Sequence, residues 1–304
     1  MNCPFCKGAT ARHTSFPVIV FNRKEFRYIR CNKCKLVYLD RFPDQEDYNA
    51  MYPPSYQQNG VEAVILSDPS VKLPGLRFSY GYQFDLIRKL SGDKAVILDH
   101  GCGNGHFLAN AIQQGFTCDG SEYNPEYIPA LEAHFTNSLF YTISQVLAAE
   151  FDRKYNVIRL SNVLEHLTEP LEVIQQLSNC LAPGGIILVE GPVEENFSLA
   201  AAFRKFYFRI IKLIRPHRTV TDPPYHILLS DARNQRQFFK DCGLTELHFA
   251  IAEDPWPFPV SLREAKGLQH KISWLIAKLS LSVTRLIGKG WGNIFIYAGK
   301  KDTE

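Results

Sequence analysis

The stretch that decides the fold is VILDHGCGNGHFL, residues 96–108. A short apolar run ends at Asp99, the glycines Gly101, Gly103 and Gly105 follow, and a helix-like segment begins directly after them. Glycine has no Cβ, so it lets the backbone turn tightly and approach a ligand closely. The pattern therefore predicts a ligand-binding turn between a strand and a helix. Its spacing is GxGxG, which differs from the GxGxxG of pyrophosphate-binding turns.

A second acid narrows the class of ligand. Glu122 ends the next predicted strand, where a carboxylate can accept hydrogen bonds from both hydroxyls of a ribose. A solvated strand end is the alternative interpretation. Asp99 lies beside the glycine turn, in a position to meet a cationic or hydroxyl group. With no pyrophosphate spacing in the turn, an adenosine ligand that carries an amino-acid end fits best.

Strand-like and helix-like segments alternate beyond residue 95. The predicted strands are residues 95–99, 116–122, 138–143, 155–161 and 184–190. This alternation predicts an α/β fold with a parallel sheet and helices on both faces. Two further predicted strands, residues 244–252 and 291–301, are expected to form an antiparallel edge.

Composition limits the class of protein. The chain has 304 residues, of which 45% are hydrophobic and 21% charged, as in ordinary globular proteins. A net charge of +3 is too small to indicate a nucleic-acid binder by itself. The first residues do not resemble a signal peptide, and no uncharged apolar run is long enough to span a bilayer. We therefore expect a cytoplasmic protein.

Two CxxC motifs flank a β-rich stretch near the N-terminus. Cys3 and Cys6 form the first, and Cys31 and Cys34 form the second. Each motif can place two thiolates on one side of a tetrahedral ion, so together they predict a structural zinc site. A redox dithiol is the alternative, but such a site belongs with one CxxC in a βαβ pattern. The other four cysteines occur singly and are predicted to be buried.

The chain divides into unequal units. Residues 1–40 are predicted to form a zinc ribbon, which contains too little apolar mass to fold without a metal. Residues 41–92 are expected to act as a linker followed by a lead-in helix. Residues 93–304 are expected to form the main domain, with helical inserts at about 194–218 and 260–289.

Four motifs resemble those of a known family. They are LDHGCGNG (98–105), the acid at Glu122, YNVIRLSNVLEHLTEP (155–170) and LAPGGIILVEGP (181–192). In this order they are similar to the class I S-adenosylmethionine-dependent methyltransferases. The resemblance spans roughly residues 93–300 and implies a doubly wound, Rossmann-like sheet of seven strands with S-adenosylmethionine as cofactor. The sequence departs from the family pattern at His100, usually aliphatic, and at Asn156, commonly acidic.

The resemblance also implies roles for single residues. Asp99 and the three glycines would surround the methionine portion of the cofactor, and Glu122 would bind its ribose. Tyr123 would contact the adenine face, and Asn162 would lie near the sulfonium.

The acceptor is expected on the same side. Tyr225 and His226 lie in a segment between the fifth and sixth strands, beyond the carboxyl ends of the strands. In similar methyltransferases a histidine in such a PxxH segment faces the acceptor, so His226 is the candidate catalytic group and Tyr225 an orienting hydroxyl. Purely structural roles are the alternative. The resemblance places His166 near the mouth of the site, where a backbone-capping role would explain it equally well.

The two helical inserts are amphipathic and basic. Residues 203–218 and 270–290 place apolar residues at helical spacing, and neither stretch contains an acid. Such helices can lie in a membrane interface, hold a phosphorylated acceptor, or simply cover the core. They favour a phosphate-bearing, lipid-linked or membrane-associated substrate.

The zinc ribbon together with these motifs resembles a group that includes deoxysugar C-methyltransferases and their O-methylating relatives. The Tyr-His-Glu-His stretch common in the C-methyltransferases is YHILL here, so methylation of a sugar or glycan hydroxyl is at least as favoured as methylation of carbon. An RNA base methyltransferase with an N-terminal zinc site is the alternative function. A non-catalytic scaffold is a third, which the intact Asp99, Glu122 and glycines argue against.

Overall fold

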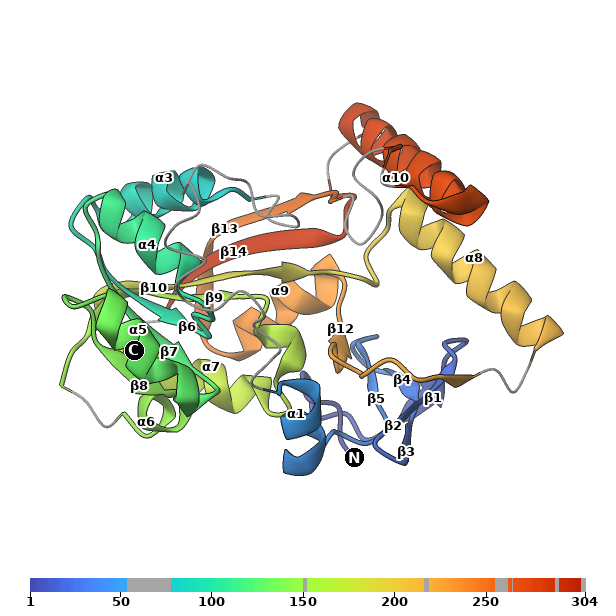
Figure 1. Ribbon diagram of the computed structural model, residues 1–304, viewed down its shortest axis with the longest axis horizontal. Helices are drawn as coiled ribbons and strands as arrows, with labels where there is room; N and C mark the ends of the chain where they lie inside the picture. The colour runs from blue at the N-terminus through green and yellow to red at the C-terminus, as the bar shows by residue number, and fades with distance from the viewer. Residues whose placement is uncertain are drawn as a thin grey trace.

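The structure is a computed structural model, and it describes residues 1–53, 78–149, 152–215, 219–254, 262–263, 265–287 and 290–301. Its centre is a seven-stranded sheet in the order β13-β14-β10-β9-β6-β7-β8 (Figure 1). The strands are β6 (Val96–His100), β7 (Thr117–Glu122), β8 (Phe140–Thr142), β9 (Tyr155–Ser161), β10 (Leu181–Pro192), β13 (Leu244–Ala252) and β14 (Ile294–Lys301). Strand β14 runs antiparallel to both β10 and β13, and the other neighbouring pairs are parallel. The predicted fold class and antiparallel edge are confirmed.

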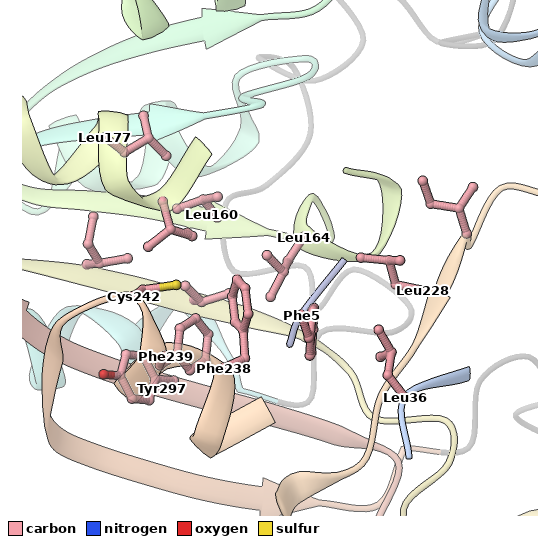
Figure 2. Close-up of a cluster of buried hydrophobic side chains, with 14 of the residues drawn as sticks. Phe5, Leu36, Leu160, Leu164, Leu177, Leu228, Phe238, Phe239, Cys242 and Tyr297 are labelled. Atoms are coloured by element: carbon pink, nitrogen blue, oxygen red, sulfur yellow. The ribbon is translucent and has the colours of Figure 1, made fainter. Parts of the chain in front are cut away.

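Helices cover both faces of this sheet. They are α3 (Tyr80–Ser91), α4 (His106–Gln113), α5 (Ile128–His134), α6 (Ile143–Leu147), α7 (Pro170–Asn179) and α9 (Ala232–Asp241). Successive residues of β6 point to opposite faces, so Ile97 joins the core under α3, α4 and α5, while Leu98 joins the core under α6, α7 and α9. Figure 2 shows the second core, which continues from the sheet to Phe5, Leu36 and Leu228.

The N-terminal unit is built from short strands. They are β1 (Ala11–His13), β2 (Val18–Phe21), β3 (Lys24–Phe26), β4 (Tyr28–Cys31) and β5 (Val37–Leu39). Two strands from much later in the chain, β11 (Thr219–Val220) and β12 (Leu228–Leu229), complete its sheets in the orders β1-β4-β5-β12 and β11-β2-β3. The ring of Phe5 also stacks on Phe238 of α9, with ring centroids 4.1 Å apart. The ribbon therefore shares both strands and core with the rest of the protein.

Part of the stretch expected to act as a linker is helical. Helix α1 (Gln45–Met51) is capped at its N-terminus by Asp44, whose carboxylate accepts a hydrogen bond from the N–H of Asp47. Residues 54–77, which contain the rest of that predicted linker, lie outside the described residues. The predicted lead-in helix corresponds to α3.

The two inserts form long helices, α8 (Leu199–Ile214) and α10 (Gly267–Ile287), which pack against each other at one end of the molecule (Figure 1). Residues 216–218, 260–261, 264 and 288–289 of the predicted inserts lie outside the described part of the chain. No helix among the described residues is long and apolar enough to cross a membrane.

Candidate active site

A large cavity opens at the carboxyl ends of the parallel strands. Its volume is about 1970 Å³, and its lining comes from the glycine turn, β7, β9, α1, α8, α10 and the segment before β12. Of the predicted site residues outside the zinc motifs, those that line it are Asp99, Gly101, Gly103, Glu122, Tyr123, Asn162, His166, Tyr225 and His226. Ligands of open α/β sheets bind at this edge, so the topology brings the predicted residues to one place.

The backbone conformation and close packing of the turn require glycine at position 101. Gly101 has a φ of +78°, and a Cβ there would lie 2.6 Å from Cγ2 of Val163. Both features exclude other residues, because a side chain would be strained and would clash. The turn therefore packs directly on the loop that follows β9. Gly105 ends the turn, also at a φ of +78°, and the helix α4 begins after it.

Glu122 closes the turn from the neighbouring strand. Its Oε2 accepts a hydrogen bond from the N–H of Gly103 at 2.8 Å, and its Oε1 accepts one from the N–H of Asn124 at 3.3 Å. Burial raises the pKa of this carboxyl, and the backbone N–H groups oppose that rise. The carboxylate thus lies at the cavity edge with lone pairs remaining for a further pair of hydroxyls.

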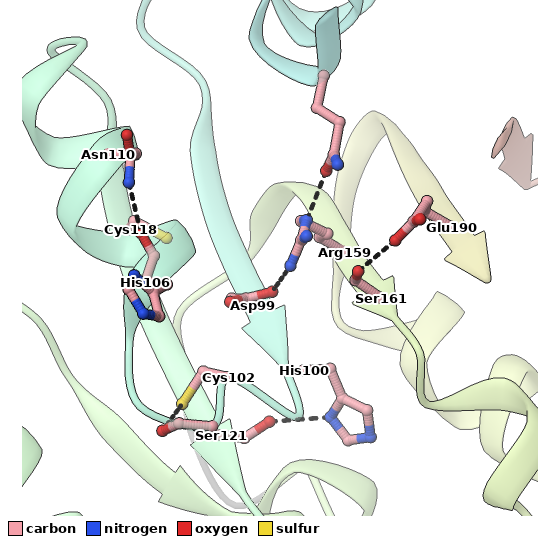
Figure 3. Close-up of polar contacts among 12 residues, drawn as sticks. Asp99, His100, Cys102, His106, Asn110, Cys118, Ser121, Arg159, Ser161 and Glu190 are labelled. Carbon is pink, nitrogen blue, oxygen red and sulfur yellow. Dashed lines mark hydrogen bonds and ion pairs between the residues drawn. The ribbon is translucent and has the colours of Figure 1, made fainter. Parts of the chain in front are cut away.

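The partner of Asp99 is a residue that the sequence motifs did not predict. Nη1 of Arg159 on β9 lies 2.6 Å from Oδ1 of Asp99, and Nε of Arg159 donates to Oε1 of Gln83 at 2.7 Å (Figure 3). The guanidinium also lies 3.9 Å from the ring centroid of Phe107. Asp99 and Arg159 are direct partners in the β6–β9 register. Asp99 therefore forms a buried ion pair that lines the cavity, and a ligand amine would meet a carboxylate already held by one cation.

Two buried polar atoms near the turn lack protein partners. Nδ1 of His100 lies 2.9 Å from Oγ of Ser121, its partner in the β6–β7 register, whereas Nε2 has no hydrogen-bond partner among the described residues. Burial lowers the pKa of His100 to about 4, so its ring is neutral. Oδ1 of Asn104 also has no partner within the described chain. Both residues line the cavity, so these atoms can bind a ligand.

Asn162 and Tyr123 also line the cavity. Asn162 adopts a φ of +52° and donates its N–H to the carbonyl of Glu190 at 2.9 Å. Tyr123 is 43% exposed, and its hydroxyl accepts a hydrogen bond from Nε2 of Gln45 at 2.7 Å. Helix α1 thus places its residues over the predicted adenine side of the cavity.

Two histidines meet at the acceptor side of the cavity. The rings of His166 and His226 lie edge to face, with centroids 5.1 Å apart. Nδ1 of His166 lies 2.6 Å from the carbonyl oxygen of Tyr225 and 3.0 Å from the hydroxyl of Tyr52. Only an N–H can approach a carbonyl in this way, which assigns the proton to Nδ1 and the lone pair to Nε2. Tyr225 contributes its backbone to this arrangement, in addition to any role of its hydroxyl.

The two rings carry different charges. Burial would lower the pKa of His226, but two neighbouring carboxylates raise it to about 9. They belong to Glu194, whose Oε1 lies 3.2 Å from Nδ1 of His226, and to Glu165. Burial and the neighbouring charge of His226 lower the pKa of His166 to about 4. Near neutral pH the cavity therefore contains one imidazolium and one neutral imidazole. Such a divergence between neighbouring groups is typical of the acid–base pairs of enzymes.

The predicted residues do not include Glu165. It is buried, burial raises its pKa to about 7, and Oε1 lies 3.7 Å from Nε2 of His166 without a hydrogen-bond partner in the described chain. One ligand atom from each of Glu165, His166 and His226 lies within 4.8 Å of the others, close enough to hold a metal ion. The same three groups can also exchange protons.

A comparison with protein families identifies the chain. Residues 56–247, over half of its length, match a family described as a methyltransferase domain. The chain belongs to the class I S-adenosylmethionine-dependent methyltransferases.

Curated relatives of this methyltransferase include ubiquinone biosynthesis O-methyltransferases. The relative from Vibrio parahaemolyticus is 31% identical over 175 residues, which cover 53% of this chain and 70% of the relative. The relative from Xanthomonas campestris is 26% identical over 124 residues, which cover 38% and 52%. The methyltransferase thus spans about half the length of the first curated relatives it matches.

Solved structures share the fold. One is a complex between the Trm112 methyltransferase activator and a methyltransferase of Haloferax volcanii, with a TM-score of 0.52 and 12% identity over 86% of this chain and 100% of that one. Another is magnesium protoporphyrin IX methyltransferase from Synechocystis with bound SAH, with a TM-score of 0.51 and 12% identity over 85% and 100% of the two chains. At this identity the likeness concerns the fold alone.

The four N-terminal cysteines of the methyltransferase converge. Sγ of Cys3 lies 3.5 Å from Sγ of Cys34, Sγ of Cys6 lies 3.6 Å from Sγ of Cys31, and all four sulfurs lie within 4.8 Å of one another. These separations are too long for disulfides. Tetrahedral zinc, with Zn–S bonds of about 2.3 Å, needs sulfurs about 3.8 Å apart, so the arrangement fits the metal. The other four cysteines are buried, as predicted.

The insert helices of the methyltransferase contribute to the cavity and also face solvent. Phe203, Phe206, Tyr207 and Ile210 of α8 and Ile272 of α10 line the cavity and are exposed. Further exposed apolar residues are Leu213, Ile214, Leu268, Leu275, Leu279 and Leu286. Among the described basic residues, Arg204 donates to the carbonyl of Glu194 and Lys205 to that of Glu195, and Nζ of Lys278 lies 5.9 Å from the ring centroid of Trp274.

Proposed function

We propose that the protein transfers a methyl group from S-adenosylmethionine to a hydroxyl of a small-molecule acceptor. The pairing of a protonated His226 with a neutral His166 in the cavity that also contains Glu122 supports this proposal. The first histidine can hold a developing oxyanion, and the second can accept a proton.

The cofactor side would be formed by the glycine turn and β7. Gly101 and Gly103 line the cavity and let the backbone approach the methionine portion closely, whereas Gly105 packs against Phe135 and does not line the cavity. The carboxylate of Glu122 has the acceptor capacity for both ribose hydroxyls. Tyr123 would lie against adenine, and Asp99 and Asn162 would line the methionine and sulfonium side. Bound S-adenosylmethionine would supply an electrophilic methyl group on a sulfonium, so the protein must chiefly position the acceptor.

The acceptor side would be formed by the two histidines. One ring nitrogen of each lies within 4.8 Å of the other, so an acceptor oxygen between the two rings would be within reach of both. As the acceptor oxygen gains the methyl group, its proton would pass to Nε2 of His166. The His226 imidazolium would donate to the same oxygen and favour its ionised form. Tyr225 would hold the tautomer of His166 through its carbonyl.

Oxygen is the acceptor atom that best matches this arrangement. The names of the curated relatives, O-methyltransferases of ubiquinone biosynthesis, support a small-molecule hydroxyl. A sugar or glycan hydroxyl meets the same geometric demands as a hydroxyl on an aromatic ring. We further propose that Cys3, Cys6, Cys31 and Cys34 hold one structural zinc ion in the ribbon formed by residues 1–40, ahead of a methyltransferase domain of residues 93–304.

We also propose a peripheral membrane contact through α8 and α10. Exposed apolar residues on both helices, such as Leu213 at 84% and Leu286 at 86%, accompany Arg209, Lys271 and Lys278 with no acid in either helix. That combination suits an anionic lipid surface. A lipid-linked or phosphorylated acceptor could then enter the cavity between these helices.

Calorimetry and a labelled-methyl assay test the function. Purified protein should bind S-adenosylmethionine with one-to-one stoichiometry. Transfer from labelled cofactor should then be screened on aromatic hydroxyl compounds, nucleotide sugars, lipid-linked glycans and RNA. A failure of folded protein to bind the cofactor would refute the proposal. Methyl transfer to RNA alone would show that the acceptor is RNA and not a small molecule.

A further inference from the structure

Strand β4 of the ribbon contacts the segments that carry the two members of the His226–Glu194 pair. The hydroxyl of Tyr28 donates to the carbonyl oxygen of His226 at 2.5 Å. Arg30, two residues later, forms an ion pair with Glu195, the neighbour of Glu194. Residues two apart on a strand point to the same face, so one face of β4 holds both segments.

These two contacts are largely shielded from solvent. Burial raises the pKa of Tyr28 far above its ordinary value, so its hydroxyl remains a donor at every working pH. The side chain of Glu195 is 1% exposed, and its ion pair with Arg30 is therefore shielded from water and weakly screened by salt. Removing the Tyr28 hydroxyl would take away a donor from the carbonyl of His226, whereas Glu195 would keep its ion pair with Lys205.

The segment after His226 is itself part of the ribbon. The N–H of Leu39 donates to the carbonyl of Ile227 at 3.2 Å, and Leu228 and Leu229 of β12 pair with β5. On its other side, the N–H of Ile227 donates to the carbonyl of Glu165 at 3.0 Å. The backbone that carries His226 is thus held between the ribbon and the loop that carries His166.

The same strand ends in a predicted zinc ligand. Cys31 follows Arg30 directly in β4, and its N–H donates to the carbonyl of Leu36 at 2.8 Å. One end of β4 therefore belongs to the four-cysteine cluster, while its Tyr28 and Arg30 contact the segments that carry His226 and Glu194.

We propose that Tyr28 and Arg30 are positioning residues, which transmit the order of the four-cysteine site to the His226–Glu194 pair. This inference rests on the proposed function of that pair. Zinc binding would hold β4, β4 would hold the backbone at residues 194–195 and 226–229, and the imidazolium would then stay at hydrogen-bond distance from the acceptor oxygen. A displacement of about 1 Å in such a group costs up to about 100-fold in rate.

Paired tyrosine variants test the inference. Tyr28→Phe removes the hydroxyl that contacts His226. Tyr38→Phe removes a buried hydroxyl of β5 that has no partner among the described residues, so it is a matched control in the same ribbon. We expect Tyr28→Phe to lower kcat about 10- to 100-fold. Zinc content and the cofactor KM should stay within twofold of the wild type, and Tyr38→Phe should leave all three quantities unchanged. Equal kcat values for the two variants, or a loss of zinc from Tyr28→Phe, would overturn the inference.

Hydrogen exchange supplies a readout that does not depend on activity. In the full-length protein, Tyr28→Phe and zinc chelation should each speed amide exchange at residues 225–229, with little change at residues 96–105. Unchanged exchange at 225–229 in both cases would overturn the coupling even if the enzyme is active. Failure of the wild type to bind the cofactor would instead count against the proposed function, and the exchange experiment would still decide the coupling.

Discussion

Nδ1 of His226 lies 3.2 Å from Oε1 of Glu194, and the other oxygen of that carboxylate has no hydrogen-bond partner among the described residues. The pair is buried, and although burial favours the neutral acid, the charge of His226 holds the pKa of Glu194 below its ordinary value. A charge pair of this kind orients the ring and keeps it protonated. His226 would then act as a cation near neutral pH, which leaves the role of base to His166.

The first prediction concerns the pH dependence of catalysis. Above its folded pKa of about 9, His226 loses the charge that faces Glu194, Glu165 and Arg204. We expect kcat/KM to fall as the pH rises through about 9. A profile measured from pH 6 to 10 checks this, and a rate that instead rises through pH 9 would show that neutral His226 acts as the base.

The free energy of unfolding should also depend on the protonation of His226. The folded pKa of His226, about 9, lies above its ordinary value of 6.5. Its contribution to the free energy of unfolding is therefore fully present below about pH 6.5 and is lost as the pH rises through 9. Urea unfolding at pH 7 and pH 9.5 should show this loss, and His226→Gln should reduce the difference. A His226→Gln protein with the same pH dependence as the wild type would assign the loss to other groups.

His166 should be needed for turnover and not for cofactor binding. His166→Gln removes the neutral ring that can accept the hydroxyl proton, and we expect kcat to fall about 100- to 10,000-fold. Its affinity for S-adenosylmethionine, measured by calorimetry, should remain within a few-fold. His134→Gln, on the exposed end of α5, is the control. Full activity of His166→Gln would remove this residue from the catalytic group.

Glu122 should govern cofactor affinity. Glu122→Ala removes a carboxylate that has the capacity to accept two ribose hydrogen bonds, and we expect the Kd to rise about 10- to 100-fold. Glu126→Ala, at an exposed position in the following turn, should bind normally. The affinities are compared by calorimetry, together with circular dichroism to verify folding. Equal affinities for the two variants would contradict the assigned ribose contact.

Zinc content should depend on the N-terminal cysteines. Cys34→Ser removes one of four converging thiols, so we expect less than one zinc per chain and a lower midpoint of thermal unfolding. Cys180→Ser changes a buried thiol outside the cluster and should retain one zinc per chain. Elemental analysis distinguishes the two. A wild-type protein purified without zinc, and unaffected by added zinc, would argue against the site.

The insert helices should attach the protein to anionic vesicles. Wild-type protein should sediment with vesicles containing phosphatidylglycerol, and raised salt should weaken the binding. Leu275→Glu, at a position 52% exposed on α10, should reduce the bound fraction several-fold. Leu139→Glu, at a position 48% exposed outside these helices, should not. Concentration-dependent dimerisation without vesicle binding would show that a second copy covers this face.

The central part of the site could be predicted because its signals are local. The glycine spacing, the acid at Glu122 and the two CxxC motifs are each encoded within a few residues. The pairing of Asp99 with Arg159 was missed, although a signal existed. Arg159 lies inside an otherwise apolar buried strand, and a buried cation there requires a carboxylate on a neighbouring strand.

Other elements could not be predicted from the residues around them in the sequence. Strands β11 and β12 contain two residues each, and they form only because the ribbon offers them an edge. Glu194 and Glu165 owe their roles to the position of His226, which is distant in sequence from both. Contacts of this kind depend on the finished tertiary structure and on no periodic pattern.

The pairing of β5 with β12 also constrains how the chain matures during synthesis. The ribosome releases β5 long before Leu228 and Leu229, and translation at roughly 5–20 residues per second separates the two by about 10 to 40 seconds. Throughout that interval the ribbon has an unpaired edge that can associate with other chains. Early capture of zinc by the four cysteines would limit this risk, so scarcity of the metal during expression should appear first as aggregation of nascent protein.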